Sequence, residues 1–174
     1  NKAKEIAKKT GVKCRTLSRP DMKKLGMGGI LNVSRGSSQP PKFIILEYNT
    51  KKQNNDTIVI IGKGVTFDSG GISLKPGKGM DLMKADMSGA AAVLGAFKAI
   101  SSLKPAAHRV GLVPCTENMP SGAALKPGDI IKCLSGKTVE ILNTDAEGRL
   151  ILADAIAYAK RYKPDAVIDL ATLT

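Results

Sequence analysis

The segment Asn143–Arg149 places two carboxylates and one guanidinium within five residues, in the order Asp145, Glu147 and Arg149. Side chains alternate in direction along an extended chain, so the two acids would point to the same side. Acids this close repel each other unless a cation lies between them, and a divalent metal ion suits carboxylate oxygens. The same two acids would also be explained by the preference of acids for the first turn of a helix.

A second group of charged residues follows the apolar stretch at 57–61. Lys63, Asp68 and Lys75 lie in a glycine-rich segment, where tight turns and close backbone approach are possible, and Asp86 follows it. Sites in open α/β sheets form at the carboxyl ends of strands, and this segment begins at such an end. We therefore predict that Lys63, Asp68 and Lys75 can converge at this end of the sheet. The alternative is that the lysines are solvated and Asp86 is an ordinary acid on a helix surface.

Several common catalytic sites are excluded by the residues present. His108 is the only histidine, which rules out a histidine-based zinc site or a Ser-His-Asp triad within this chain, so we interpret it as structural. The residues 136–138 resemble the end of a phosphate-binding loop, but Ile131 stands where that loop needs a glycine. Any metal ion must therefore be held by carboxylates and carbonyls, with a neutral lysine as an optional further ligand.

The composition indicates a folded domain with an uneven charge. The 174 residues are 43% hydrophobic, and no apolar run approaches the ~20 residues of a membrane span. Of the net charge of +12, residues 1–55 carry +10 (thirteen basic, three acidic) and residues 56–174 carry +2 (fourteen basic, twelve acidic). DNA binding by the basic segment is an alternative function, but the segment has few aromatic residues, and a solvated basic face explains it more simply.

The cysteines and the chain ends give two further expectations. Cys14, Cys115 and Cys133 form no C-x-x-C pair, which favours a reduced, intracellular chain with small buried thiols. No start methionine precedes Asn1, and no polar tail follows the apolar end at Thr174. We therefore expect residues 1–174 to be part of a longer protein, truncated at both ends.

The elements that would position these residues alternate between strands and helices. The patterns predict a helix at 2–9 that ends at Gly11, a loop at 20–41, a polar turn at 51–56, and helices at 81–103 and 147–162. Apolar runs predict strands at 43–48, 57–61 and 110–113, a hairpin of 130–134 with 138–142, and a last buried strand at 166–170. The resulting fold class is α/β, with a mixed, mostly parallel sheet and helices on both faces.

The chain resembles the leucyl aminopeptidases, or cytosol aminopeptidases, a family of two-metal exopeptidases. The resemblance extends over essentially the whole chain and lies in segments 65–71, 83–87, 117–122, 143–150 and 171–174, of which 143–150 is the most specific. It implies that residues 1–174 are part of a catalytic domain that hydrolyses amino-terminal, leucine-like residues from peptides. It also implies a cytoplasmic homohexamer with no membrane partner. The isolated chain is expected to be weakly active or inactive.

The resemblance implies a ligand set for two ions. Asp68 and Glu147 would bridge two divalent metal ions about 3.5–4 Å apart. Lys63 and Asp86 would complete the shell of one ion, and Asp145 would complete the other through its side chain and its backbone carbonyl. Zn²⁺ and Mn²⁺ are the expected ions, with Mg²⁺ and Co²⁺ as alternatives.

The resemblance also implies roles in substrate binding and proton transfer. Lys75 would hydrogen-bond the substrate carbonyl, and Arg149 would hold a bicarbonate that acts as general base. Met83 would line the pocket for the first side chain of the substrate, although a core position would also explain it. Thr172 and Leu173 would contact the substrate backbone.

Overall fold

The computed structural model describes residues 1–50 and 56–173 and is built on a six-stranded sheet. The strands lie in the order β1-β2-β5-β3-β8, and β4 pairs with β5 beyond the end of β3. Three of the five pairings are parallel (β3 with β5, β3 with β8, β4 with β5) and two are antiparallel. The mixed sheet agrees with the predicted fold class. The strand bounds are β1 Lys13–Leu17, β2 Lys42–Asn49, β3 Thr57–Gly62, β4 Gly64–Asp68, β5 His108–Asn118 and β8 Ala166–Leu170.

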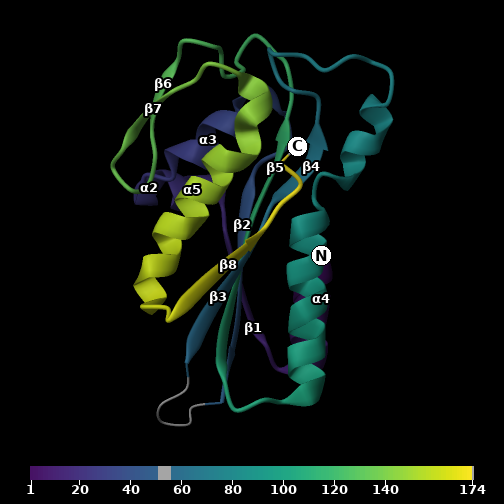
Figure 1. Ribbon diagram of the computed structural model, residues 1–174, viewed down its shortest axis with the longest axis vertical. Helices are drawn as coiled ribbons and strands as arrows, with labels where there is room; N and C mark the ends of the chain where they lie inside the picture. Colours follow the sequence, from purple (N-terminus) through teal and green to yellow (C-terminus); the bar gives the residue numbers. More distant parts are fainter. Residues whose placement is uncertain (51–55, 174) are drawn as a thin grey trace.

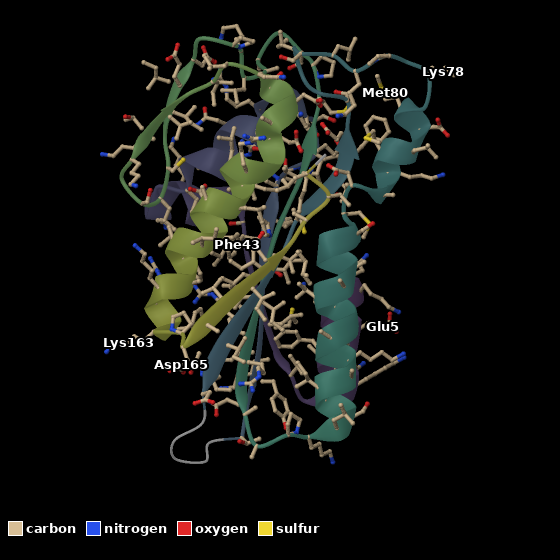
Figure 2. The ribbon with its side chains drawn as sticks, viewed as in Figure 1. Glu5, Phe43, Lys78, Met80, Lys163 and Asp165 are labelled. Atoms are coloured by element: carbon tan, nitrogen blue, oxygen red, sulfur yellow. The ribbon has the colours of Figure 1, made fainter. Side chains whose placement is uncertain are left out.

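Helices cover both faces of this sheet (Figure 1). On one face lie α1 (Lys2–Thr10) and α4 (Ser88–Leu103), and on the other lie α3 (Gly28–Val33) and α5 (Glu147–Ala159). Each face has its own hydrophobic cluster. Phe97 of α4 is buried on the first face. On the second face Phe43 of β2, which is labelled in Figure 2, lies beneath α5. Its ring centroid is 5.1 Å from that of Tyr158 of α5. The two clusters hold the sheet between two helical layers.

The predicted hairpin and the amino-terminal helix are confirmed. Strands β6 (Ile130–Lys132) and β7 (Thr138–Glu140) form a separate two-stranded sheet. Helix α1 ends at Gly11, whose φ of 72° is the left-handed conformation that glycine adopts most easily. Most of the predicted polar turn at 51–56 lies outside the described residues.

The prediction of a loop at 20–41 is wrong. Helix α2 (Arg19–Leu25), helix α3 and the 3₁₀ turn η1 (Ser34–Gly36) occupy most of it. Asp21 accepts a hydrogen bond from Ser18 N (2.8 Å), and Pro20 stands in the first turn, where proline is well tolerated. The prolines and glycines therefore begin and end short helices here. Strands β1 and β4 were also missing from the prediction.

The predicted helix at 81–103 is divided into two. The 3₁₀ helix η2 (Met80–Ala85) is followed by a break at Asp86 and Met87, and only then does α4 begin. The break turns Asp86 inward, to 7% exposure, instead of leaving it on a helix surface. The predicted helix at 147–162 is confirmed as α5 followed by the 3₁₀ helix η4 (Lys160–Tyr162).

The stretch at 166–170 is a strand, but it is not buried. β8 pairs with β3 alone and lies at the edge of the sheet, with Val167 41% and Ile168 49% exposed. Its apolar composition correctly predicted a strand, whereas burial depends on neighbours that local sequence does not specify. The cysteines differ in a similar way, since Cys133 is buried while Cys14 and Cys115 are half-buried. No helix in the described part of the chain is long and apolar enough to cross a membrane.

Candidate metal centre

Lys63 enters the site directly after β3, and its backbone is fixed on both sides. Its N–H donates to the carbonyl oxygen of Leu170 (3.0 Å), and its carbonyl accepts from Ala90 N (2.9 Å). Only 3% of the residue is exposed. Its ammonium lies 2.9 Å from a carboxylate oxygen of Asp86 and 2.8 Å from Glu147 Oε1, and donates to the carbonyl oxygen of Thr172 (2.7 Å). Lys63 thus joins acids that lie more than 20 and more than 80 residues away along the chain.

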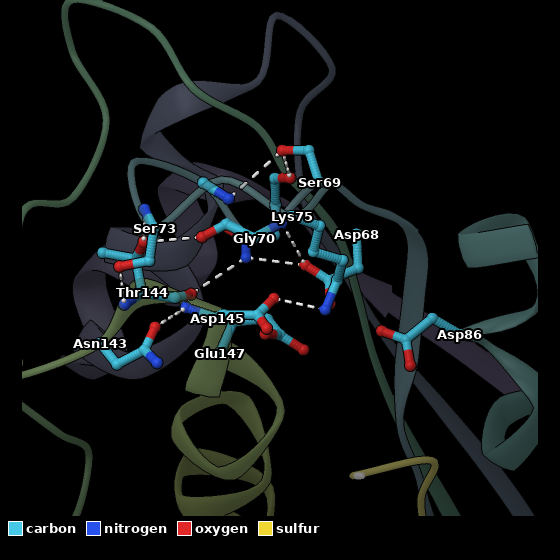
Figure 3. Close-up of polar contacts among 12 residues, drawn as sticks. Asp68, Ser69, Gly70, Ser73, Lys75, Asp86, Asn143, Thr144, Asp145 and Glu147 are labelled. Atoms are coloured by element: carbon cyan, nitrogen blue, oxygen red, sulfur yellow. Dashed lines mark hydrogen bonds and ion pairs between the residues drawn. The ribbon is translucent and has the colours of Figure 1, made fainter. Parts of the chain in front are cut away.

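Asp68 and Lys75 lie at either end of the loop that follows β4. Gly70 and Gly71 adopt positive φ values of 87° and 69°, which L-residues with side chains rarely adopt. Gly70 N donates to Asp68 Oδ1 (3.0 Å), and the loop then returns so that Lys75 Nζ lies 3.1 Å from Asp68 Oδ2. The same ammonium lies 2.5 Å from Asp145 Oδ1. Figure 3 shows Lys75 between the two carboxylates.

The segment at 143–147 presents its two acids in different ways. Asp145 lies in a 3₁₀ turn, η3 (Thr144–Ala146), where its N–H donates to Asn143 Oδ1 (2.8 Å). Glu147 begins α5 and is only 2% exposed. Gly148 follows it because a Cβ at this position would lie 2.8 Å from Lys63 Cε. The segment therefore forms the start of a helix, whereas the sequence analysis predicted an extended chain here. Both acids nevertheless face the site.

The carboxylates form a cluster that fits a divalent cation. Asp68, Asp86 and Glu147 are buried, and their ligand oxygens lie within 4.8 Å of one another. With Asp145 there are four carboxylates against the two lysine ammonium groups, a formal charge of −4 + 2 = −2. Hard oxygen donors with a net negative charge are the ligands that divalent ions prefer.

Carboxylate oxygens without a hydrogen bond also indicate that the cluster fits a divalent cation. Among the buried side-chain atoms of the described residues, Asp86 Oδ2, Asp145 Oδ1 and Glu147 Oε2 accept no hydrogen bond. The first two have an ammonium nearby but lack hydrogen-bond geometry, whereas Glu147 Oε2 has no partner. A buried polar atom without a partner is costly unless a ligand satisfies it, so the donor set fits the implied ions.

Burial and ion pairing act in opposite directions on the charged groups. Burial lowers the pKa of Lys63 and of Lys75, but hydrogen bonds and ion pairs to two carboxylates outweigh it and raise both pKa values above 10.5. Burial raises the pKa of Glu147, and the hydrogen bond from Lys63 offsets this only in part, while the Asp68 charge adds to it. The site therefore favours cations and resists further negative charge.

The remaining predicted residues are not all brought to the cluster. Thr172 is, because its hydroxyl donates to Asp86 Oδ1 (2.7 Å), and Leu173 lies beside Gly148. Met83 is half-buried on η2. Arg149 is exposed on α5, and within the described structure it makes no ion pair or hydrogen bond, so its side chain is free to bind a ligand but is not joined to the carboxylates.

Two polar residues at the centre were not predicted. Asn118 ends β5 and Thr144 precedes Asp145, and both are buried at 4% and 2% exposure. The segment 117–122 was noted for its resemblance, but nothing local indicated a role for Asn118. His108, by contrast, is structural as predicted, since its ring contacts Thr57 Oγ1 (3.0 Å) and Glu47 Oε1 (3.2 Å).

Comparison with known proteins agrees over the whole chain. A family model described as the cytosol aminopeptidase family, catalytic domain, matches residues 1–174. The chain is 59% identical over 169 residues to the probable cytosol aminopeptidase of Aromatoleum aromaticum, covering 97% of this chain and 34% of that protein. It is 57% identical over 173 residues to the one from Pseudomonas aeruginosa, covering 99% of this chain and 35% of that protein. The chain thus spans about a third of the length of these curated relatives. Nothing in these likenesses supports a DNA-binding role for residues 1–55.

Proposed function

The chain belongs to the cytosol aminopeptidase family, and from this membership we propose that it forms the metal-binding part of an aminopeptidase that removes leucine-like residues from the amino termini of peptides. The observation that carries the proposal is the buried cluster of Asp68, Asp86 and Glu147, whose oxygens include atoms without a hydrogen-bond partner. The whole protein would be a cytoplasmic homohexamer.

Five residues would hold two divalent ions. They are Lys63, Asp68, Asp86, Asp145 and Glu147, which offer four carboxylates and one amine nitrogen. An amine binds a metal ion only when neutral, so Lys63 would release its proton as the ion enters. Zn²⁺ or Mn²⁺ would suit this mixture of oxygens and one nitrogen, and Mg²⁺ or Co²⁺ would also be accepted. When bound, the ions would act as Lewis acids toward the scissile carbonyl and make water a better nucleophile.

Lys75 would stabilise the charge that develops on the substrate. Its ammonium is held between Asp68 and Asp145, and its side chain keeps 22% of its surface exposed. From this position it would donate a hydrogen bond to the carbonyl oxygen as that oxygen becomes negative. The raised pKa of Lys75 keeps the group charged at neutral pH.

Arg149 would hold a bicarbonate ion. A guanidinium offers parallel N–H donors that match a planar oxyanion, and the bound bicarbonate would act as the general base. The exposed, unpaired state of Arg149 among the described residues supports this use.

Three further residues would contact the substrate. Thr172 lies at the rim of the cluster through its bonds to Lys63 and Asp86, and Leu173 follows it with 48% exposure. Both would face the peptide backbone. Met83, half-buried on η2, would line the pocket for the first side chain.

The test replaces ligands in the full-length protein. Glu147→Gln keeps the shape of the side chain and Asp145→Ala removes a donor, and each should lower both metal content and hydrolysis of a leucyl amide by more than about 100-fold. Glu140→Gln, an exposed acid on β7, is the matched control and should change neither. Hydrolysis at the wild-type rate by either ligand variant would contradict the proposal.

A further inference from the structure

Asn118 lies between the two segments that supply the proposed metal ligands. It is the last residue of β5, the central strand, and is 4% exposed. We propose that Asn118 is a positioning residue that sets the distance and orientation between Asp68 and Asp145. This inference rests on the proposed function, and it adds a residue to which the family resemblance gave no role.

The side-chain amide of Asn118 contacts both segments at once. Its Nδ2 donates to Asp68 Oδ1 (2.9 Å) and to the carbonyl oxygen of Thr144 (3.0 Å), the residue before Asp145. The backbone carbonyl oxygen of Asn118 accepts from Ser69 N (3.0 Å) and Ser69 Oγ (2.7 Å). One residue therefore connects the end of β4 with the start of η3, which are more than 70 residues apart in sequence.

These bonds fix the direction of each ligand. Asn118 and Gly70 N both bind Asp68 Oδ1, which leaves Oδ2 to face Lys75. The peptide between Thr144 and Asp145 is held at its oxygen by Asn118 and at its nitrogen by Asn143 Oδ1. These two hydrogen bonds therefore fix the peptide group on the amino-terminal side of Asp145.

Asparagine is the residue type that this position needs. A primary amide has two N–H donors, and both targets here are oxygens, so aspartate or leucine of similar size would satisfy neither. A longer side chain is opposed by the tight surroundings, because even a Cβ added to Gly71 would lie 2.8 Å from Asn118 Oδ1. Groups that orient metal ligands in this way affect metal affinity without touching the metal.

The test measures metal binding and not only activity. In the full-length, metal-free protein we would titrate Mn²⁺ against a chelating dye and record electron paramagnetic resonance of the loaded protein. Asn118→Leu keeps the volume without the donors, and Asn118→Ala removes both. Each should weaken Mn²⁺ binding by about 10–100-fold and replace the signal of a coupled ion pair by that of separate ions. Asn32→Ala, which removes one amide hydrogen bond to Gly28 in α3, should leave both unchanged.

Three outcomes are decisive. Wild-type Mn²⁺ affinity and coupling in Asn118→Leu would overturn the proposal. The proposal would also be overturned if Asn118→Leu lost Mn²⁺ affinity and its metal-free form unfolded at a much lower temperature than metal-free Asn32→Ala. Asn118 would then have a structural role only. If the wild-type protein itself binds no pair of ions, the proposed function fails before Asn118 is tested, so the two failures are distinguishable.

Discussion

At the residue scale, the site is a balance between burial and charge. Asp68 and Glu147 are buried to 3% and 2% exposure, which would be costly for lone carboxylates. Lys63 and Lys75 each lie between two of the acids, so every carboxylate of the cluster has an ammonium within 3.1 Å. The pairing compensates the buried charge but leaves an excess of negative charge for a divalent ion.

Lys75 allows a test of charge stabilisation during the reaction. Lys75→Met removes the ammonium while keeping most of the side-chain length, and kcat for a leucyl amide should fall by about 10²–10³-fold with little change in KM. The reason is that the lost interaction would form only as the carbonyl oxygen gains charge. Lys78→Met, at an exposed lysine three residues further along the chain, should leave kcat unchanged. A loss of kcat/KM that came entirely from KM would contradict this role.

At the element scale, the start of α4 is packed against β3 and β8. A Cβ on Gly89 would lie 2.0 Å from the carbonyl oxygen of Leu170, and one on Gly62 would lie 2.5 Å from the carbonyl oxygen of Gly89. This close approach allows Ala90 N to bond the Lys63 carbonyl and so fixes the ligand-bearing turn. The close contact lies at Gly89, near the amino-terminal end of α4.

Two glycines of α4 serve as the test position and the control position for this contact. Gly89→Ala should lower the free energy of unfolding by about 1–3 kcal/mol, because the added carbon meets backbone atoms that cannot move aside easily. Gly95→Ala, where nothing lies within 4 Å, should raise it by about 0.5–1 kcal/mol through helix propensity. Chemical denaturation measures both, and effects of the same sign would contradict the packing described.

At the scale of the whole molecule, two partly buried groups make stability sensitive to alkaline pH. Burial raises the pKa of Cys115 from 9.0 to about 12, and burial raises the pKa of Tyr162 from 10.0 to about 12. As pH rises, the unfolded chain releases these protons before the folded chain does. The stabilising contribution is therefore complete below about pH 9 and is lost as the pH approaches 12.

Removing these groups should flatten the alkaline limb of the stability profile. Below about pH 9 the unfolding free energies of wild type and Cys115→Ala should differ by a constant amount, and above it the wild type should lose stability faster. Tyr162→Phe should show the same divergence beginning near pH 10. Parallel profiles up to pH 12 would contradict the burial of both groups.

The exposed apolar strand β8 leads to a prediction about the activity of residues 1–174 when they are expressed alone. Val167 and Ile168 lie exposed at the sheet edge, and three residues separate Ile168 from Thr172 of the proposed substrate contact. Residues 1–174 expressed alone should bind Mn²⁺, since they contain the five proposed ligands, but hydrolyse a leucyl amide much more slowly than the full-length protein. Steady-state rates per bound metal pair provide the comparison, and equal rates would contradict the expectation.

The sequence by itself determined which residues could form the site and several of the elements that hold them. The apolar runs at 43–48 and 57–61 became β2 and β3, and the acids at 145 and 147 stand at the start of the predicted helix. These features depend on the order of residues within a few positions, which side-chain periodicity and glycine placement express directly. The family resemblance added the grouping of Lys63, Asp68, Asp86 and the two acids.

Only the tertiary structure decided how those residues meet. The break before α4 that turns Asp86 inward, the bonds of Asn118 to Asp68 and Thr144, and the exposure of β8 all depend on contacts between segments roughly 20 to 110 residues apart. Local propensity carries no information on such pairs, because burial and hydrogen bonding at these positions are set by whichever distant element packs against them.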